Sequence, residues 1–272
     1  MPRAATPTAT VPLTLVHGDD EYAVKQRAKA LFQQWSSEIG GMDHEIIDAQ
    51  VTNSGEALKV LGRLREALQT LPFFGTGKAV WLQQCNFLGD DRAASAQAVT
   101  EGLASLAEDL KTFSWQNVRL LISAGKVDKR KTFYKTLEKL GTVESHTAWS
   151  MEDKDWVFEA ESLARRALQA DHKEITDEAL AELVANVGPN RRQLISEVEK
   201  LSLFASGHDE ISLSHVNAVV TRNKQARAFA LGDALGERDL PKILRTLDEA
   251  LWELKFDRSE ERRVGKECRS RW

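Results

Sequence analysis

Two adjacent phenylalanines occupy a turn where polar residues are expected. The turn follows a predicted helix whose leucines recur at a period near 3.6, and it precedes an apolar run, residues 79–82, typical of a buried strand. Connecting turns are normally polar and solvated. Leu71, Phe73 and Phe74 therefore indicate either a hydrophobic contact offered to a partner or a cap folded back on the sheet. For a lone pair of phenylalanines the cap is the favoured interpretation.

Two glycine–lysine pairs, at 77–78 and 125–126, suggest phosphate chemistry. A phosphate-binding loop needs a glycine five positions before the second one, and a Ser or Thr after the lysine. Pro72 and Leu120 stand where the first glycine should be, so neither pair forms such a loop.

The usual place for a phosphate loop is directly after the first strand. Gly18, Asp19, Asp20 and Glu21 stand there, with three carboxylates and no lysine. Carboxylates repel phosphate, so we interpret this stretch as a degenerate phosphate loop that binds no cofactor. His17 and these carboxylates could hold a divalent cation. An N-cap at Asp19 or Asp20, with Glu21 in the first helical turn, explains the same residues more simply.

No other residue pattern provides a catalytic constellation. No His and Cys spacing suits zinc, no Gly-x-Ser-x-Gly elbow occurs, and no strand ends in paired acidic residues. Cys85 ends an apolar strand and is expected to be a small core residue. The sequence therefore predicts no catalytic activity, no metal site and no cofactor.

Composition describes an ordinary soluble protein. The 272 residues are 42% hydrophobic and 29% charged, enough for two domains. No apolar run approaches the roughly 20 residues that cross a bilayer, so no membrane contact is expected. Cys85 and Cys268 form no disulfide framework, which favours the cytoplasm. The net charge is −4, and residues 258–272 carry six Arg and Lys against three Glu, so the remaining chain is the more acidic part and should bind duplex DNA weakly.

Strand and helix patterns alternate in the first half of the chain. This alternation predicts an α/β fold, a doubly wound parallel sheet covered on both faces. The predicted strands are residues 13–16, 44–47, 79–83, 118–122 and 142–144, and the predicted helices after the first lie near 54–69, 91–111 and 129–140.

The pattern becomes all-α near residue 149. Ser150, with Glu152 and Asp153 after it, predicts the start of a helix, and Thr176 the cap of the next. Helical spacing continues to a short helix at 211–220 without any strand signal. Residues 149–223 are therefore predicted to form a small helical bundle.

The end of the chain is different again. Residues 224–257 hold two amphipathic helices, which bury little alone and are interpreted as the start of a third domain. Residues 258–272 lose all periodicity and are interpreted as a non-native tail, a native basic tail being the alternative. Residues 1–10 are predicted to be a short disordered lead.

Four stretches together resemble a known family. Residues 15–22, 70–75, 126–131 and 190–201 are similar, in order and spacing, to the delta subunit of bacterial DNA polymerase III, a clamp-loader member of the AAA+ superfamily. The resemblance implies an AAA+-like α/β domain over residues 11–148, a lid-like helical bundle over 149–223, and over 224–257 a fragment of a helical collar domain that is truncated at its C-terminal end.

The resemblance also implies a function. Such a subunit has no chemistry of its own within the polymerase holoenzyme, a nucleotidyltransferase. A hydrophobic wedge binds the sliding clamp and favours ring opening, for loading onto primed DNA during replication. Leu71, Phe73 and Phe74 fall where the family places this wedge, which reverses the preference for a cap. Burying each ring should contribute about 1.5–3 kcal/mol.

Partners follow from the same resemblance. They are the sliding clamp, the ATPase subunits of the loader and a delta-prime-like subunit. The shortened collar is expected to weaken assembly with the loader, and DNA is contacted only within the complex.

Two alternatives remain open. The first is an active AAA+ ATPase or nucleotide-switched module, which the fold allows. The second is a DNA-binding helical module that uses Arg191, Arg192 and Lys200, or the basic run 126–135. A solvated helix face explains both basic clusters more simply.

Overall fold

The chain divides into two compact units, residues 1–148 and 149–272. The computed structural model describes residues 12–70, 72 and 77–220, and farther along 232, 234–236, 238–241, 243–248 and 251. The predicted lead and the predicted tail lie outside the described residues, and so do Leu71, Phe73 and Phe74.

Unit 1 is built on a five-stranded parallel sheet with the order β2-β3-β4-β1-β5. Its strands are β1 (Leu13–His17), β2 (Glu45–Asp48), β3 (Lys78–Cys85), β4 (Val118–Ala124) and β5 (Thr142–Ser145). Parallel strands need a crossover between them, and the alternating helices supply it. The predicted α/β class with a parallel sheet is confirmed.

The strand β1 holds the sheet together. It pairs with β4 on one side, Leu15 opposite Ile122, and with β5 on the other, Leu15 opposite Val143. All five residues of β1 are buried. Leu13 and Leu15 face one core and Val16 faces the other, as a strand covered on both faces requires.

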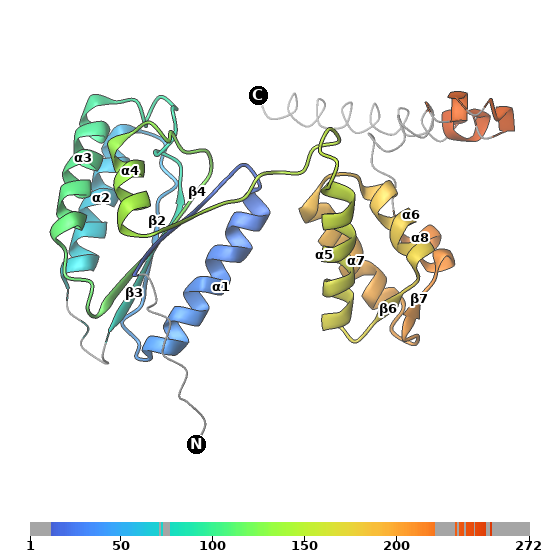
Figure 1. Cartoon of the computed structure of the whole chain (residues 1–272), viewed down its shortest axis with the longest axis horizontal. Coiled ribbons are helices and arrows are strands. Elements are labelled where there is room, and N and C mark those ends of the chain that lie inside the picture. Colours follow the sequence, from blue (N-terminus) through green and yellow to red (C-terminus); the bar gives the residue numbers. More distant parts are fainter. Residues whose placement is uncertain are drawn as a thin grey trace, which may run out of the picture. The chain divides into compact units, whose positions relative to one another are not determined.

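Helices cover both faces of the sheet (Figure 1). They are α1 (Glu21–Ile39), α2 (Ser54–Gln69), α3 (Gln97–Thr112) and α4 (Thr132–Leu140). Helix α1 packs Val24, Leu31 and Trp35 against one face, around Trp81. Helices α2, α3 and α4 pack on the other face, where they form the larger core.

Two helices begin later than predicted. Helix α3 begins at Gln97 instead of residue 91, and α4 at Thr132 instead of residue 129. The intervening residues are bound as turns: Ser95 Oγ donates to the Asp90 carbonyl at 3.0 Å, and Lys131 N donates to the Asp128 carbonyl at 3.1 Å. Polar groups that bond to nearby backbone compete with the helical ladder, which explains both errors.

Unit 2 is mainly helical, with α5 (Trp156–Ala170), α6 (Asp177–Val187), α7 (Arg191–Phe204) and α8 (Leu213–Val219) around one core (Figure 1). The expectation of a bundle without strands is wrong in detail. The two-residue strands β6 (Glu174–Ile175) and β7 (Glu210–Ile211) pair in parallel. The last helix of this group is shorter than predicted because Ile211 belongs to β7.

The cap at Thr176 is confirmed and the one at Ser150 is wrong. Thr176 accepts a hydrogen bond from Ala179 N, as an N-cap does. Ser150 instead lies in a turn, where its carbonyl accepts from Asp153 N at 3.1 Å, and α5 begins only at Trp156.

The predicted helices of residues 224–257 are only partly described. Among the described positions between 232 and 251, leucines 235, 240, 244, 247 and 251 are exposed and Ala234 is buried. None of the helices in the described ranges is long and apolar enough to cross a membrane.

The turn after β1 yields a test of the fold. Gly18 has φ +152°, and a Cβ there would meet the His146 carbonyl at 1.8 Å. We expect Gly18→Ala to lower the free energy of unfolding by about 2 kcal/mol or more. Gly62, in α2, has open space around it, so the control Gly62→Ala should add up to about 1 kcal/mol. Urea denaturation measures both, and equal stability of the two variants would contradict this account of the turn.

Candidate functional site

The parallel sheet has two edges, and each carries one of the features predicted from sequence. The α2–β3 turn enters the sheet where β3 begins, at the amino edge. The segment Gly18–Glu21 follows the end of β1, at the carboxyl edge. In open α/β sheets ligands bind outside the carboxyl ends of the strands. The apolar turn and the degenerate phosphate loop therefore belong to opposite edges.

The apolar turn is fixed at its first end by the last turn of α2. Thr70 N and Thr70 Oγ1 both donate to the Glu66 carbonyl, at 2.9 and 2.7 Å. This bonding satisfies a carbonyl that has no partner within the helix. The helix therefore ends at Gln69, and the predicted contact residues Leu71, Phe73 and Phe74 follow at once, outside the described residues.

The second end of the turn is fixed by β4 and α2. Lys78 N donates to the Asn117 carbonyl at 2.7 Å, and a Cβ on Gly77 would lie 2.8 Å from that same carbonyl oxygen. The Lys78 side chain is only 6% exposed. Its Nζ donates to the Ala67 carbonyl at 2.9 Å and to Glu45 Oε2 at 3.1 Å.

Sequence reasoning considered Gly77 and Lys78 only as an incomplete phosphate loop. It missed that Lys78 links the end of α2 to the start of β3. The available signal was a lysine at the entrance of an apolar strand, Ala79–Leu82, where the ammonium must find partners when it is buried.

A cleft of about 440 Å³ opens at the carboxyl edge. Loops after four strands line it: His17, Gly18 and Asp19 after β1, Gly89 and Asp90 after β3, 126–130 after β4, and Ser145 at the end of β5. Three Asp residues and three Lys or Arg residues line it, so neither sign of charge prevails around it. The structure thus brings part of the degenerate phosphate loop together with the basic run.

The β1–α1 turn is too short and too well bonded to surround a phosphate. Asp20 Oδ1 accepts from Ala23 N at 2.8 Å and caps α1, as predicted for one of two aspartates. Asp19 Oδ1 accepts from Ala148 N at 2.8 Å. Glu21 lies in the first helical turn. The helix N-terminus that a phosphate would use therefore already carries a carboxylate.

His17 lies at the end of β1 and is 4% exposed. Its ring meets the Tyr134 ring edge-on, with the centroids 5.8 Å apart. Burial lowers the pKa of His17, and the nearby Lys129 and His146 lower it further. The burial of this ring and its contact with Tyr134 fit a packed strand end.

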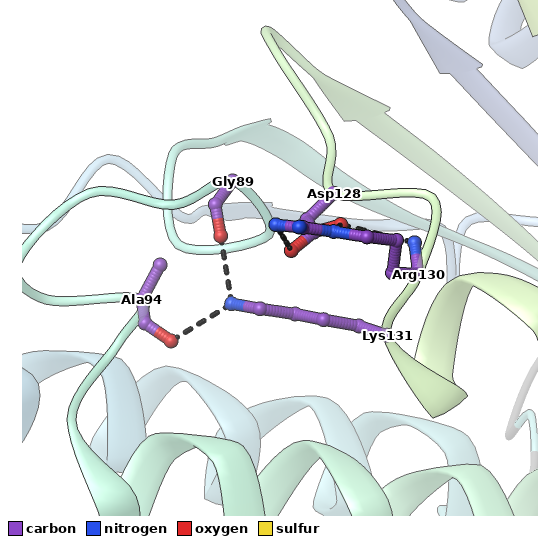
Figure 2. Close-up of polar contacts among 5 residues, drawn as sticks. All are labelled: Gly89, Ala94, Asp128, Arg130 and Lys131. Carbon is purple, nitrogen blue, oxygen red and sulfur yellow. Dashed lines mark hydrogen bonds and ion pairs between the residues drawn. The ribbon is translucent and has the colours of Figure 1, made fainter.

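The loop after β4 is tied to the loop after β3 (Figure 2). Lys131 Nζ donates to the carbonyls of Gly89 and Ala94, at 2.7 and 2.9 Å. Arg130 donates through Nε and Nη2 to the two carboxylate oxygens of Asp128, and this lowers the Asp128 pKa to about 2. Two members of the predicted basic run are therefore bound within the protein.

Two of the three basic residues of unit 2 that were considered for DNA binding contact other side chains of the same unit. Arg191 lies over the Trp149 ring, 4.3 Å from its centroid, and 3.5 Å from Glu159. Lys200 pairs with Glu197 at 2.6 Å. Arg192 is exposed. These contacts favour a structural role for Arg191 and Lys200.

Reactive groups do not gather in the part of the chain that the structure describes. Burial raises the pKa of Cys85 to about 12, so its thiol is a core group and not a nucleophile. Within the same described ranges, no three His, Cys, Asp or Glu side chains lie together as metal ligands would.

Comparison with known proteins gives concordant results. Residues 15–146 match the sequence family "DNA polymerase III, delta subunit". DNA polymerase III subunit delta of Bacillus subtilis is 24% identical over 185 residues, which are 67% of this chain and 51% of that protein. The chain thus spans about half the length of the curated relative it matches. The predicted resemblance to the delta subunit is confirmed.

A solved structure agrees with the fold. The DNA clamp loader delta protein of Bacillus subtilis superposes with a TM-score of 0.56 at 18% identity, covering 90% of this chain and 68% of the other. At this identity the likeness supports the architecture alone.

The carboxyl-edge geometry leads to a nucleotide prediction. Because Asp20 caps α1 and no lysine stands in the β1–α1 turn, ATP with Mg²⁺ should produce no saturable heat in the high-micromolar range. Isothermal calorimetry on the full chain measures this. A micromolar dissociation constant would contradict the degenerate interpretation of Gly18–Glu21.

A second prediction concerns the loop of Figure 2. The Asp128 carboxyl should titrate near 2, followed by NMR of its carboxyl carbon, and Arg130→Met should move its pKa up toward the usual range. Because the folded pKa is depressed, the pairing stabilises the fold above the unfolded pKa and is lost as pH falls toward 2. Lys129→Met, an exposed neighbour, should leave the titration unchanged, and an unchanged titration in Arg130→Met would contradict the pairing.

Proposed function

We propose that this chain, whose residues 15–146 match the delta-subunit family of DNA polymerase III, is a clamp-loader subunit of the replicative polymerase. It binds the sliding clamp and favours opening of the ring for loading onto primed DNA. The match covers nearly all of unit 1, which contains both the apolar turn and the sheet that holds it. This match is the observation that carries the proposal.

The stems of the apolar turn support the clamp-binding assignment. Thr70 is bonded to the end of α2, and Lys78 is bonded to both α2 and the neighbouring strands. A turn with such ends can present apolar side chains at low entropic cost, because less freedom is lost on binding. Leu71, Phe73 and Phe74 are the side chains we assign to this contact.

The carboxyl edge supports a subunit without chemistry of its own. The Asp20 cap and the absence of a lysine in the β1–α1 turn leave no cradle for triphosphate. The ATPase subunits and a delta-prime-like subunit of the loader would handle nucleotide. This chain would meet DNA only inside that complex, in the cytoplasm.

Each segment then has a proposed part. Residues 11–148 form the AAA+-like domain that carries the clamp contact, and 149–223 form the lid-like bundle. Residues 224–257 supply helices of the collar through which loader subunits associate. The exposed leucines among the described residues of this last segment fit such a packing surface.

The clamp contact is tested by the double variant Phe73→Ala/Phe74→Ala. If both rings enter a pocket on the clamp, affinity should fall by about 2 kcal/mol or more per ring. The melting temperature should barely move, because neither ring then belongs to the core. Surface plasmon resonance with the clamp and thermal melting measure the two quantities on the same samples.

Two single variants serve as controls. Phe87 is fully buried, so Phe87→Ala should cost about 3–5 kcal/mol of stability. Phe158 is 75% exposed in unit 2, and Phe158→Ala should change neither affinity nor melting. If the double variant melts early like Phe87→Ala and keeps its affinity, the rings cap the sheet and the proposed contact is wrong.

A further inference from the structure

A buried ammonium stands at the entrance of β3. The Lys78 side chain is 6% exposed, at the first residue of a strand whose next four residues are buried. Removing an ammonium from water costs several kcal/mol unless hydrogen bonds and an opposite charge compensate it. The contacts of Lys78 Nζ must therefore offset the cost of removing this ammonium from water.

The shorter and more buried contact of Lys78 Nζ is with the backbone and not with a carboxylate. Nζ donates to the Ala67 carbonyl at 2.9 Å in a buried setting. Ala67 lies in the last turn of α2, where carbonyls have no partner within the helix. The second partner, Glu45 Oε2, lies 3.1 Å away on a side chain that is 39% exposed. This partly buried carboxylate supplies the opposite charge that offsets part of the desolvation of the ammonium.

These contacts close the apolar turn at its base. Lys78 follows the turn and Ala67 precedes it, so the Nζ–carbonyl hydrogen bond joins the two ends across residues 68–77. Thr70 Oγ1 donates to the carbonyl of Glu66, the residue before Ala67 in the last turn of α2. Gly77, pressed against the Asn117 carbonyl, fixes the path by which the chain re-enters the sheet.

We propose that Lys78 is a positioning residue for clamp binding, which caps the C-terminus of α2 and thereby holds the ends of the apolar turn. The inference rests on the proposed function. Lys78 itself is buried, and we assign it no direct contact with the clamp. It acts on affinity by keeping the binding-competent form of the turn populated, since apparent affinity falls in proportion to that population.

A role in stability alone would be served better by another residue. A methionine at position 78 removes one member of the ion pair and leaves Glu45, which is 39% exposed and can be hydrated. A methionine at position 78 would fill the same space without the cost of desolvation. The methionine side chain has no N–H group and cannot donate a hydrogen bond to the Ala67 carbonyl. Capping of the α2 C-terminus is therefore the property that distinguishes lysine from methionine at this position.

The test is Lys78→Met in the full chain. We expect the dissociation constant for the clamp to rise about tenfold, the change for a competent population reduced to about a tenth. Hydrogen exchange should accelerate at the amides of Thr70 and Lys78, which bond to Glu66 and Asn117. Exchange in β1 and β4 should stay as in the unaltered protein.

Two matched controls separate charge from capping. Lys59 is an exposed lysine of α2, and Lys59→Met makes the same change of charge without touching the turn. Glu45→Gln removes the carboxylate and leaves the Ala67 hydrogen bond. Both variants should bind the clamp within about twofold of the unaltered chain. A tenfold loss in Glu45→Gln would overturn capping as the cause.

Clamp affinity within twofold in a folded Lys78→Met variant would overturn the inference. If that variant loses its global fold, Lys78→Gln is the second test. The glutamine side chain keeps a polar N–H group, but its nitrogen is one bond closer to the backbone than Nζ and falls short of the Ala67 carbonyl. Gln at this position should weaken binding threefold or more with melting preserved, and unchanged affinity there would overturn the inference. Failure of the unaltered chain to bind the clamp would instead reject the proposed function.

Discussion

The parallel pairing of β1 between β4 and β5 is the constraint on which the rest of unit 1 depends. Parallel strands cannot be joined by tight hairpins, so each connection crosses the sheet through a helix. Every helix-to-strand turn therefore arrives at the amino edge and every strand-to-helix loop leaves from the carboxyl edge. This separation keeps the apolar turn before Lys78 away from the cleft beside His17.

The two edges differ in how their backbone groups are satisfied. At the carboxyl edge the loops bond to one another, through Asp20 at the start of α1 and through Lys131 on Gly89 and Ala94. Asp20 thereby occupies the helix N-terminus that a nucleotide's phosphates would otherwise use. At the amino edge Lys78 donates to the Ala67 carbonyl and to Glu45, directly beside the turn that we propose as the clamp contact. We propose the amino-edge turn as the binding surface, whereas the cleft at the carboxyl edge lies between loops that are bonded to one another.

The sequence predicts those helix and strand limits that depend on residues a few positions apart. The α2 limits, 54–69, agree with the structure because apolar spacing and an Asn53 cap act within a few residues. The predicted start of α3 was wrong because Ser95 bonds to the Asp90 carbonyl in a turn, which the spacing of apolar residues does not record. Strands β6 and β7 have two residues each, too few for any period.

The candidate site shows the same division. The Asp20 cap could be predicted, since a cap acts across three residues. A lysine at the entrance of an apolar strand signals a buried ammonium. Its partner, the Ala67 carbonyl, could not be predicted because a backbone carbonyl has no side-chain signature.

The central claim is that the amino-edge turn meets the clamp, and hydrogen–deuterium exchange of the full chain with and without the clamp tests it most directly. The account predicts added protection in peptides that span residues 70–78, with unchanged exchange in the carboxyl-edge loops 86–96 and 125–131. Protection of those two loops, with residues 70–78 exchanging as in the free chain, would contradict it.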